Sequence, residues 1–170
     1  MAFPRKLKQM MMYIEGVGYA ADTESVTLPD LARKFEAWRG GAMHRAVMID
    51  LGSEDELNLE HSYGGPITAI LGQFGIQDLS GLQLRFVGSY QDDESNTFHQ
   101  CQITVRGRHQ KIARGDQKPG EAGEFKVTTA CTYYKEEWDG VVVIEDDPLN
   151  SFLIVDGVDL MAEHRANLGL

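Results

Sequence analysis

The sequence predicts a mainly β protein, an antiparallel β-sandwich or partial barrel with one flanking α-helix. Three observations support this fold class. Several segments alternate apolar and polar residues with a period of two, an Asp-Gly pair separates two such segments, and one segment alone has a clear helical period. Each alternating segment is apolar on one side and polar on the other, as in an antiparallel sheet with one face in water. A length of 170 residues fits a single domain, 1–170.

Five strands are expected in the first third of the chain, at 8–15, 24–28, 31–38, 46–51 and 56–63. Segment 31–38 is ambiguous, because Leu31, Phe35 and Trp38 would also share one face of a helix. We favour a strand there, since a proline lies just upstream and Gly40-Gly41 just after.

Three longer strands are expected at 82–91, 98–108 and 124–136. The apolar faces of the last two are assigned to His99, Cys101, Ile103 and Val105, and to Phe125, Val127, Cys131 and Tyr133. Tyr134 interrupts the polar face of the last strand. After it, Asp139-Gly140 predicts a two-residue hairpin, because this pair tolerates the positive φ angles of a type I′ turn.

One helix is expected after Gly64-Gly65. Pro66 suits the first helical position, and Gly75 can end the helix. Between them, apolar residues fall at i, i+3, i+4 and i+7, namely Ile67, Ile70, Leu71 and Phe74. The sequence is also compatible with a short C-terminal helix that is capped by Asp159, with an apolar stripe of Leu160, Met161, His164 and Leu168.

Three segments lack a core-like pattern. They are an extended N-terminal arm at about 1–8, a polar glycine-rich loop at about 114–123 and a C-terminal segment at about 156–170. The basic start leads into only five apolar or aromatic residues, 10–14, which is too short for a secretory signal. We therefore expect synthesis and assembly in a cytoplasm, without a membrane anchor.

The charges are unevenly distributed along the chain. The net charge of −10 disfavours nucleic-acid binding, which needs a positive surface. Residues 1–14 contain three bases and no acid, residues 104–118 are mostly basic, and residues 136–163 contain an excess of acids. Blocks of one sign can act as complementary patches in self-association.

The sequence contains no convincing constellation for catalysis, cofactor binding or metal binding. Two cysteines are too few for a disulfide framework, and Asp92-Asp93-Glu94 and Glu145-Asp146-Asp147 are interpreted as hydrated turns. His99 and Cys101 share a strand face, but zinc needs three or four converging ligands. We expect no enzyme activity and no cofactor.

Self-assembly is suggested by the long one-sided strands. One short helix can cover little of such a sheet, so copies of the chain are expected to cover the rest or to pair with its edges.

The chain resembles the major tail tube proteins of contractile-tailed bacteriophages and of R-type pyocins, which are related headless tails. The matching stretches run in order from end to end: Phe3-Pro4-Arg5-Lys6-Leu7-Lys8, Val26-Thr27-Leu28-Pro29-Asp30-Leu31, Arg39-Gly40-Gly41-Ala42-Met43, Ile49-Asp50-Leu51-Gly52, Gly88-Ser89-Tyr90, Val105-Arg106-Gly107-Arg108, Cys131-Thr132-Tyr133-Tyr134-Lys135, Val155-Asp156-Gly157-Val158-Asp159, His164-Arg165 and Asn167-Leu168-Gly169-Leu170. No single stretch is diagnostic, but the ordered set is specific.

The resemblance implies a structural subunit of the virion. Six copies would close a ring, and stacked rings would form the inner tube through which DNA passes without specific binding. The implied partners are other copies of the chain, the tail sheath protein, and the baseplate, tail terminator and tape-measure proteins.

Specific residues can be assigned to these surfaces. By strand alternation, the lumen-facing acids are expected to be Glu60, Glu124 and Glu136. Contacts between subunits are expected at the basic residues Arg5, Lys6, Arg106, Arg108, Lys111, Arg114 and Lys118.

Two alternatives remain at this stage. A type VI secretion tube protein shares the ring logic, but the stretches above favour the phage and pyocin family. A small β-barrel enzyme or ligand-binding module would need a convergent polar pocket, which the sequence does not indicate.

Overall fold

The chain folds mainly into antiparallel strands with two short helices, as the sequence predicts, and the computed structural model describes residues 3–170. The first strands are β1 (Lys6–Ile14), β2 (Val17–Gly18), β3 (Thr23–Thr27), β4 (Ala32–Trp38), β5 (Val47–Glu54) and β6 (Leu57–Tyr63). The later strands are β7 (Leu82–Asp92), β8 (Thr97–Ala113), β9 (Phe125–Trp138), β10 (Val141–Asp147), β11 (Phe152–Val155) and β12 (Val158–Asp159). The helices are α1 (Thr68–Gly72) and α2 (Ala162–Leu168).

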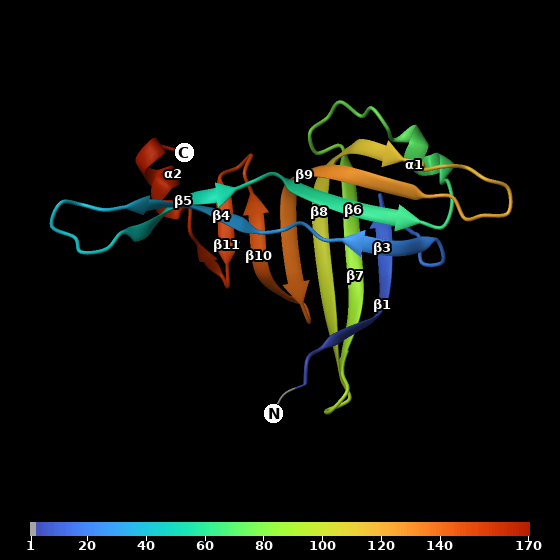
Figure 1. The fold of residues 1–170 in the computed structure, drawn as a ribbon, viewed down its shortest axis with the longest axis horizontal. Coiled ribbons are helices and arrows are strands. Elements are labelled where there is room, and N and C mark those ends of the chain that lie inside the picture. The colour runs from blue at the N-terminus through green and yellow to red at the C-terminus, as the bar shows by residue number, and fades with distance from the viewer. Residues whose placement is uncertain (1–2) are drawn as a thin grey trace.

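One large sheet runs in the order β12-β11-β10-β9-β8-β7-β1-β2, and it divides at β9. The first half of β9 pairs with β6, which in turn pairs with β3, whereas the second half pairs with β10. In Figure 1, β3 and β6 lie across β1, β7 and β8. The sheet therefore folds over itself into a partial barrel, and α1 lies at one end of it.

The core lies inside this fold. Its buried residues come from both parts of the sheet and from α1, and they are Met12, Ile14, Leu59, Tyr63, Ile70, Leu82, Leu84, Phe86, Cys101, Ile103, Val105, Phe125, Val127 and Tyr134. Alternation along β7 and β8 places the side chains as the sequence predicts. At Asp139-Gly140 the φ angles of +49° and +82° confirm the positive-φ hairpin turn.

The expected faces of β9 are wrong beyond Cys131. The register of the β8–β9 pairing shifts at this point. Arg106 lies opposite Tyr133 and the next residue, Gly107, lies opposite Cys131, so Thr132 has no partner and forms a β-bulge. The extra residue reverses the alternation. Tyr134 is therefore buried in place of Tyr133, and Glu136 lies on the core side of the strand.

Helix α1 is shorter than expected. It begins at Thr68 rather than at Pro66, because Ile67 has an extended conformation, and Gln73 caps its end. Ile70 is fully buried, but Phe74 is 58% exposed, so the apolar stripe ends with the helix. The helix therefore covers one end of the core through Ile70 and does not cover a face of the sheet.

The chain ends also differ from the expectation. The first strand begins at Lys6, so the free part of the N-terminal arm within the described residues is 3–5, and residues 1–2 lie outside them. Helix α2 forms, but its N-cap residue is Met161, and Asp159 accepts a hydrogen bond from the Met161 amide at 2.9 Å. No residue of α2 is buried; of the expected apolar stripe, Leu160, His164 and Leu168 are exposed, while Met161 is half-buried at the groove.

Candidate assembly surfaces

A group of exposed apolar residues lies on the hairpin of β4 and β5, a separate two-stranded sheet. The hairpin projects sideways from the partial barrel (Figure 1), and none of its residues is part of the described core. Its exposed apolar residues are Phe35, Trp38, Val47, Met48, Ile49 and Leu51. A two-stranded hairpin alone is marginally stable in water, so this element requires another surface to cover it.

Both faces of the hairpin are partly apolar. Residues directly opposite in an antiparallel pair share a face. Trp38 lies opposite Val47 on one face, and Ala37 lies opposite Met48 on the other. Because one side of the hairpin cannot cover the other, burial of both faces needs contacts from outside the hairpin.

The outer part of this hairpin, residues 38–48, is here called the tip. It contains Arg39, His44 and Arg45, and no acidic residue lies between Glu36 and Asp50. The Arg39 Nε donates to the carbonyl of Met43 at 3.1 Å, which orders the turn. The tip therefore combines apolar side chains with positive charge.

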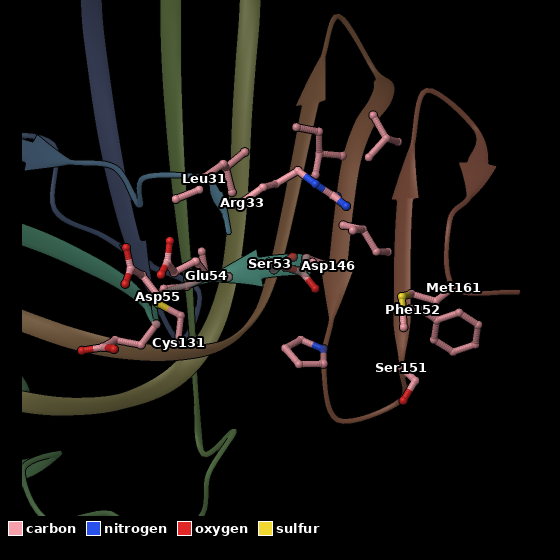
Figure 2. Close-up of a pocket in the computed structure, with 18 residues that line it drawn as sticks. Leu31, Arg33, Ser53, Glu54, Asp55, Cys131, Asp146, Ser151, Phe152 and Met161 are labelled. Carbon is pink, nitrogen blue, oxygen red and sulfur yellow. The ribbon is translucent and has the colours of Figure 1, made fainter. Parts of the chain in front are cut away.

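A groove of about 650 Å³ lies between the base of the hairpin and the β10–β11 edge of the large sheet (Figure 2). Its surface is largely apolar and includes Leu31, Leu57, Ile144, Leu153, Val155 and Met161. Four acids also line it, namely Glu54, Asp55, Glu56 and Asp146. Its one base is Arg33, which pairs with Asp50 at 2.7 Å. This lined space is called the groove below.

Asp146 is half-buried in the groove, and the sequence interpretation of its cluster as a hydrated turn is wrong for this residue. Burial raises the pKa of its carboxyl, and the neighbouring charge of Asp147 raises it further. An incoming positive charge would favour the ionised carboxylate and so oppose this rise in pKa.

The expected basic contact residues do not form one patch. Arg106 and Arg108 lie on the outward face of β8, where the Arg106 guanidinium stacks over Tyr133 at 4.7 Å and Arg108 donates to the Gln77 carbonyl. Lys111 lies further along the same strand, while Arg114 and Lys118 lie in the loop after it. Arg5 and Lys6 lie at the other end of the molecule, beside the β7–β8 turn.

The expected lumen acids fall into two groups. Glu60 and Glu124 lie near Lys126, and the Glu60 carboxylate is 2.7 Å from the Lys126 ammonium. That contact with Glu60 raises the pKa of Lys126. Glu136 instead accepts hydrogen bonds from the Tyr134 hydroxyl and the Trp138 indole, at 2.8 and 2.7 Å.

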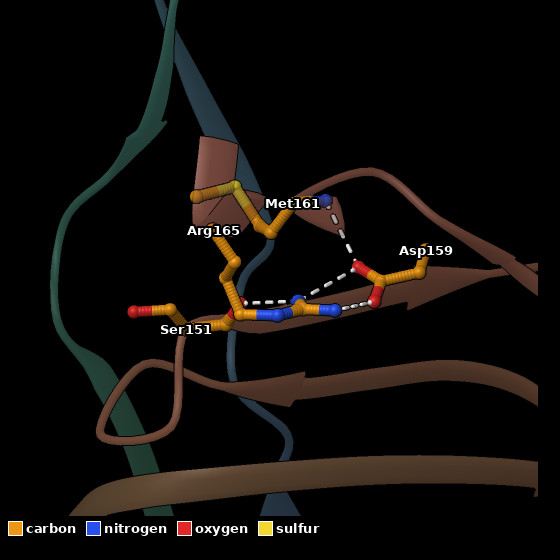
Figure 3. A network of polar contacts seen from close by, with 4 residues as sticks. All are labelled: Ser151, Asp159, Met161 and Arg165. Carbon is orange, nitrogen blue, oxygen red and sulfur yellow. Dashed lines mark hydrogen bonds and ion pairs between the residues drawn. The ribbon is translucent and has the colours of Figure 1, made fainter. Parts of the chain in front are cut away.

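The C-terminal helix is held in place by Arg165 (Figure 3). The guanidinium donates to both carboxylate oxygens of Asp159 and to the Ser151 carbonyl, and it stacks over Phe152 at 4.2 Å. The Arg165 contact, followed by the Met161 amide, lowers the pKa of Asp159. One side chain thus links α2 to β11 and β12.

The hairpin tip and the groove are the surfaces that sequence reasoning missed. A signal was present, because the strands 31–38 and 46–51 contain apolar residues in both alternation phases around a basic glycine-containing turn. Within residues 3–170, no group of three His, Cys, Asp or Glu side chains is placed to hold a metal ion. No helix in the same range is long and apolar enough to cross a membrane.

An exposed apolar hairpin and an apolar groove with charged borders are features of proteins that bind other protein chains. The partial barrel of antiparallel strands that displays them places the chain in the class of mainly β proteins with protein-binding surfaces.

Comparison with known proteins gives the family. The family described as "Phage tail tube protein FII" matches residues 4–169. The chain is 39% identical to the tail tube protein of Escherichia phage P2, over the whole of both chains. It is 32% identical to the major tail tube protein of Serratia phage KSP20, over all of this chain and 99% of that one. The chain belongs to the phage tail tube protein family, and it is a structural component of the virion.

Solved structures share the fold at low sequence identity. One is a chain from the sheath/tube terminator of an extracellular contractile injection system, with a TM-score of 0.59 and 8% identity, covering 79% of this chain and 97% of that chain. Another is a chain from the sheath-tube complex of such a system, with a TM-score of 0.59 and 9% identity, covering 79% and 92%.

Proposed function

We propose that six copies of this chain close into a ring and that the rings stack into the inner tube of a contractile tail. The observation that carries this proposal is the β4–β5 hairpin, which has apolar residues on both faces and packs chiefly against itself. Membership of the tail tube family supplies the class of assembly. Copies of the chain are the partners that would cover the hairpin.

Ring closure through sheet edges is consistent with the topology. Strand β2 pairs only with Tyr13 and Ile14 of β1, so most of the outer edge of β1 has no strand beside it among the described residues. At the other end of the sheet, β12 pairs with only two residues of β11. Edge pairing between copies would satisfy these backbone groups, and a closed ring leaves no free edge.

The channel would conduct DNA without binding it. Six copies at −10 each give a formal charge of −60, and like charge repels phosphates at short range. Of the lumen candidates, Glu124 is exposed, and Glu60 borders the same surface hollow, where its carboxylate pairs with Lys126. Glu136 is less suited, because it lies on the core side of β9 and accepts hydrogen bonds from Tyr134 and Trp138.

The remaining partners follow from the same proposal. The sheath would bind the tube, as the name of the sheath-tube complex indicates for a protein of that fold, and we place it around the outside of the tube. The baseplate, tail terminator and tape-measure proteins would meet the tube at its ends or inside it. The role would be mechanical, with no catalytic step.

The test is the oligomeric state of the purified full chain over a range of protein and salt concentrations. We expect particles of six subunits, or hollow tubes built from them, by light scattering and negative-stain electron microscopy. A strictly monomeric chain at the highest concentrations, across all salt conditions, would overturn the proposal.

A further inference from the structure

We infer that the basic tip of the β4–β5 hairpin of one copy inserts into the acidic groove of a second copy. This inference rests on the proposed self-assembly and names the two surfaces that meet. The tip is residues 38–48, and the groove lies between the hairpin base and the β10–β11 edge.

Charge complementarity is the first argument. The tip contributes Arg39 and Arg45 and contains no acid. The groove contributes four acids, of which Glu54 lies 3.8 Å from the Lys34 ammonium. Its one base, Arg33, is paired with Asp50. Opposite potentials steer the two surfaces together and fix their register, and like-charged pairings of tip with tip or groove with groove are disfavoured.

Apolar complementarity is the second argument. Trp38 is 61% exposed and Met48 is 62% exposed in the single chain. The groove offers apolar side chains from β6, β10 and β11, including Leu57, Ile144 and Leu153. A tryptophan in a desolvated pocket is the kind of residue that dominates binding at protein interfaces. The groove volume of about 650 Å³ is large enough for several side chains.

The geometry requires a second copy. Arg33 and Ser53, which lie opposite each other at the hairpin base, line the groove, whereas Trp38 and Val47 mark the other end of the same ribbon. The seven residues of β4 span about 23 Å at the usual rise of a strand. The tip therefore points away from its own groove, as the projecting ribbon in Figure 1 shows.

The contact joins two different surfaces, so each copy can bind one neighbour through its tip and another through its groove. Such a head-to-tail contact repeats until it closes a ring or continues as a filament. It is thus compatible with a tube, whereas a contact between identical surfaces would stop at a dimer.

The N-terminal segment is the other basic and apolar candidate for the groove. Part of it is already fixed within the chain, because the Lys8 ammonium lies 2.9 Å from Asp93 and β1 pairs with β7 from Lys6 onward. The tip has no such pairing with the large sheet, and it is the occupant that we test.

The first experiment maps the contact directly. A photo-crosslinking amino acid replaces Trp38 in the full chain, and isotopically labelled and unlabelled chains are assembled together before irradiation. Mass spectrometry should find crosslinks between labelled and unlabelled chains that end on groove residues such as Leu57, Phe152 or Leu153. Crosslinks that end elsewhere, for example on the outward face of β8, would overturn the inference. A crosslinking amino acid placed in the groove, in the reverse experiment, would also overturn it by reacting with Phe3 of a neighbouring copy instead of with the tip.

The second experiment is a charge exchange. The tip variant R39E/R45E and the groove variant E54K/E56K should each reduce the sedimentable assembled fraction at low salt by about tenfold or more. A mixture of the two should recover assembly, because each altered tip meets an oppositely altered groove and each native tip meets a native groove. Failure of the mixture to recover, with both chains folded by circular dichroism, would contradict the pairing.

A matched control carries the same charge change outside the groove. The variant E94K/E163K changes two exposed acids, one in the β7–β8 turn and one on α2, and it should assemble as the unchanged chain does. If the unchanged chain forms no rings or tubes, the proposed function fails. If it assembles but the tip and groove variants assemble equally well, only this inference fails.

Discussion

Two buried histidines form a polar network in the core that the assembly surfaces do not use. The Thr129 hydroxyl lies 3.1 Å from His61 Nε2 and 2.9 Å from His109 Nδ1, and the Tyr63 hydroxyl lies 2.8 Å from His61 Nδ1. Burial lowers the pKa of His61 to about 3, with a smaller effect from nearby His109. Burial also lowers the pKa of His109 to about 4. Both rings are therefore neutral in the folded chain at neutral pH.

This network predicts loss of stability in mild acid. The unfolded chain takes up protons near pH 6.5, whereas the folded histidines resist protonation until about pH 4 and 3, so the free energy of unfolding falls as the pH drops below 6.5. Each histidine contributes a slope of up to about 1.4 kcal/mol per pH unit. The test is urea denaturation of the non-assembled chain from pH 7 to 4.5. His109→Gln should reduce the slope of the unfolding free energy against pH by the contribution of one histidine, up to about 1.4 kcal/mol per pH unit. An unchanged slope would show that His109 titrates normally in the fold.

Individual residues of β7, β8 and β9 show which side-chain positions the sequence predicts and which it does not. The alternation of β7 and β8 was predictable because each register holds for many residues, and Cys101, Ile103 and Val105 are buried as expected. The bulge at Thr132 was not, because it depends on pairing with β8 and leaves no local signature. One extra residue moved Glu136 from the expected polar face to the core side.

At the scale of elements, α2 depends on one side chain. None of its residues is buried, and Leu168 is 74% exposed, so apolar burial does not hold it against the sheet. The contacts of Arg165 with Asp159 and Ser151 fix its position instead. The αL conformation of Gly169 ends the helix, with the Leu170 amide donating to the Arg165 carbonyl.

Removal of this contact should release the helix without unfolding the core. We expect Arg165→Ala to abolish the hydrogen-exchange protection of the α2 amides, while the protection of β7 and β8 stays unchanged. Glu163→Ala, in the same helix and outside this network, serves as the control. Retained protection of α2 in Arg165→Ala would mean that other contacts hold the helix.

The hairpin and α1 show which elements a sequence can predict. The strand predicted at 31–38 is confirmed as β4, and the helical alternative is wrong, since the flanking proline and glycines bound a short segment. Its partner and its separation from the large sheet depend on tertiary structure and could not be inferred. The helical period of 67–74 correctly located α1, but its length is set by the end of the barrel that it covers.

At the scale of the whole molecule, the single chain leaves several apolar surfaces exposed. The buried core fills the inside of the partial barrel. The hairpin, the groove and α2, in contrast, expose apolar residues to solvent. Ordered stretches of the sequence are sufficient to predict the family. They do not predict the hairpin tip or the groove. The sequence places the expected contacts at segregated basic residues, whereas six exposed apolar residues lie on the hairpin.

A cryo-electron microscopy reconstruction of tubes grown from the full chain tests the central claim most directly. The account predicts rings of six subunits around an open channel, with Trp38 and Met48 of every copy buried against a neighbouring copy. An assembly of another symmetry, or six-fold rings in which both faces of the hairpin remain in solvent, would contradict it.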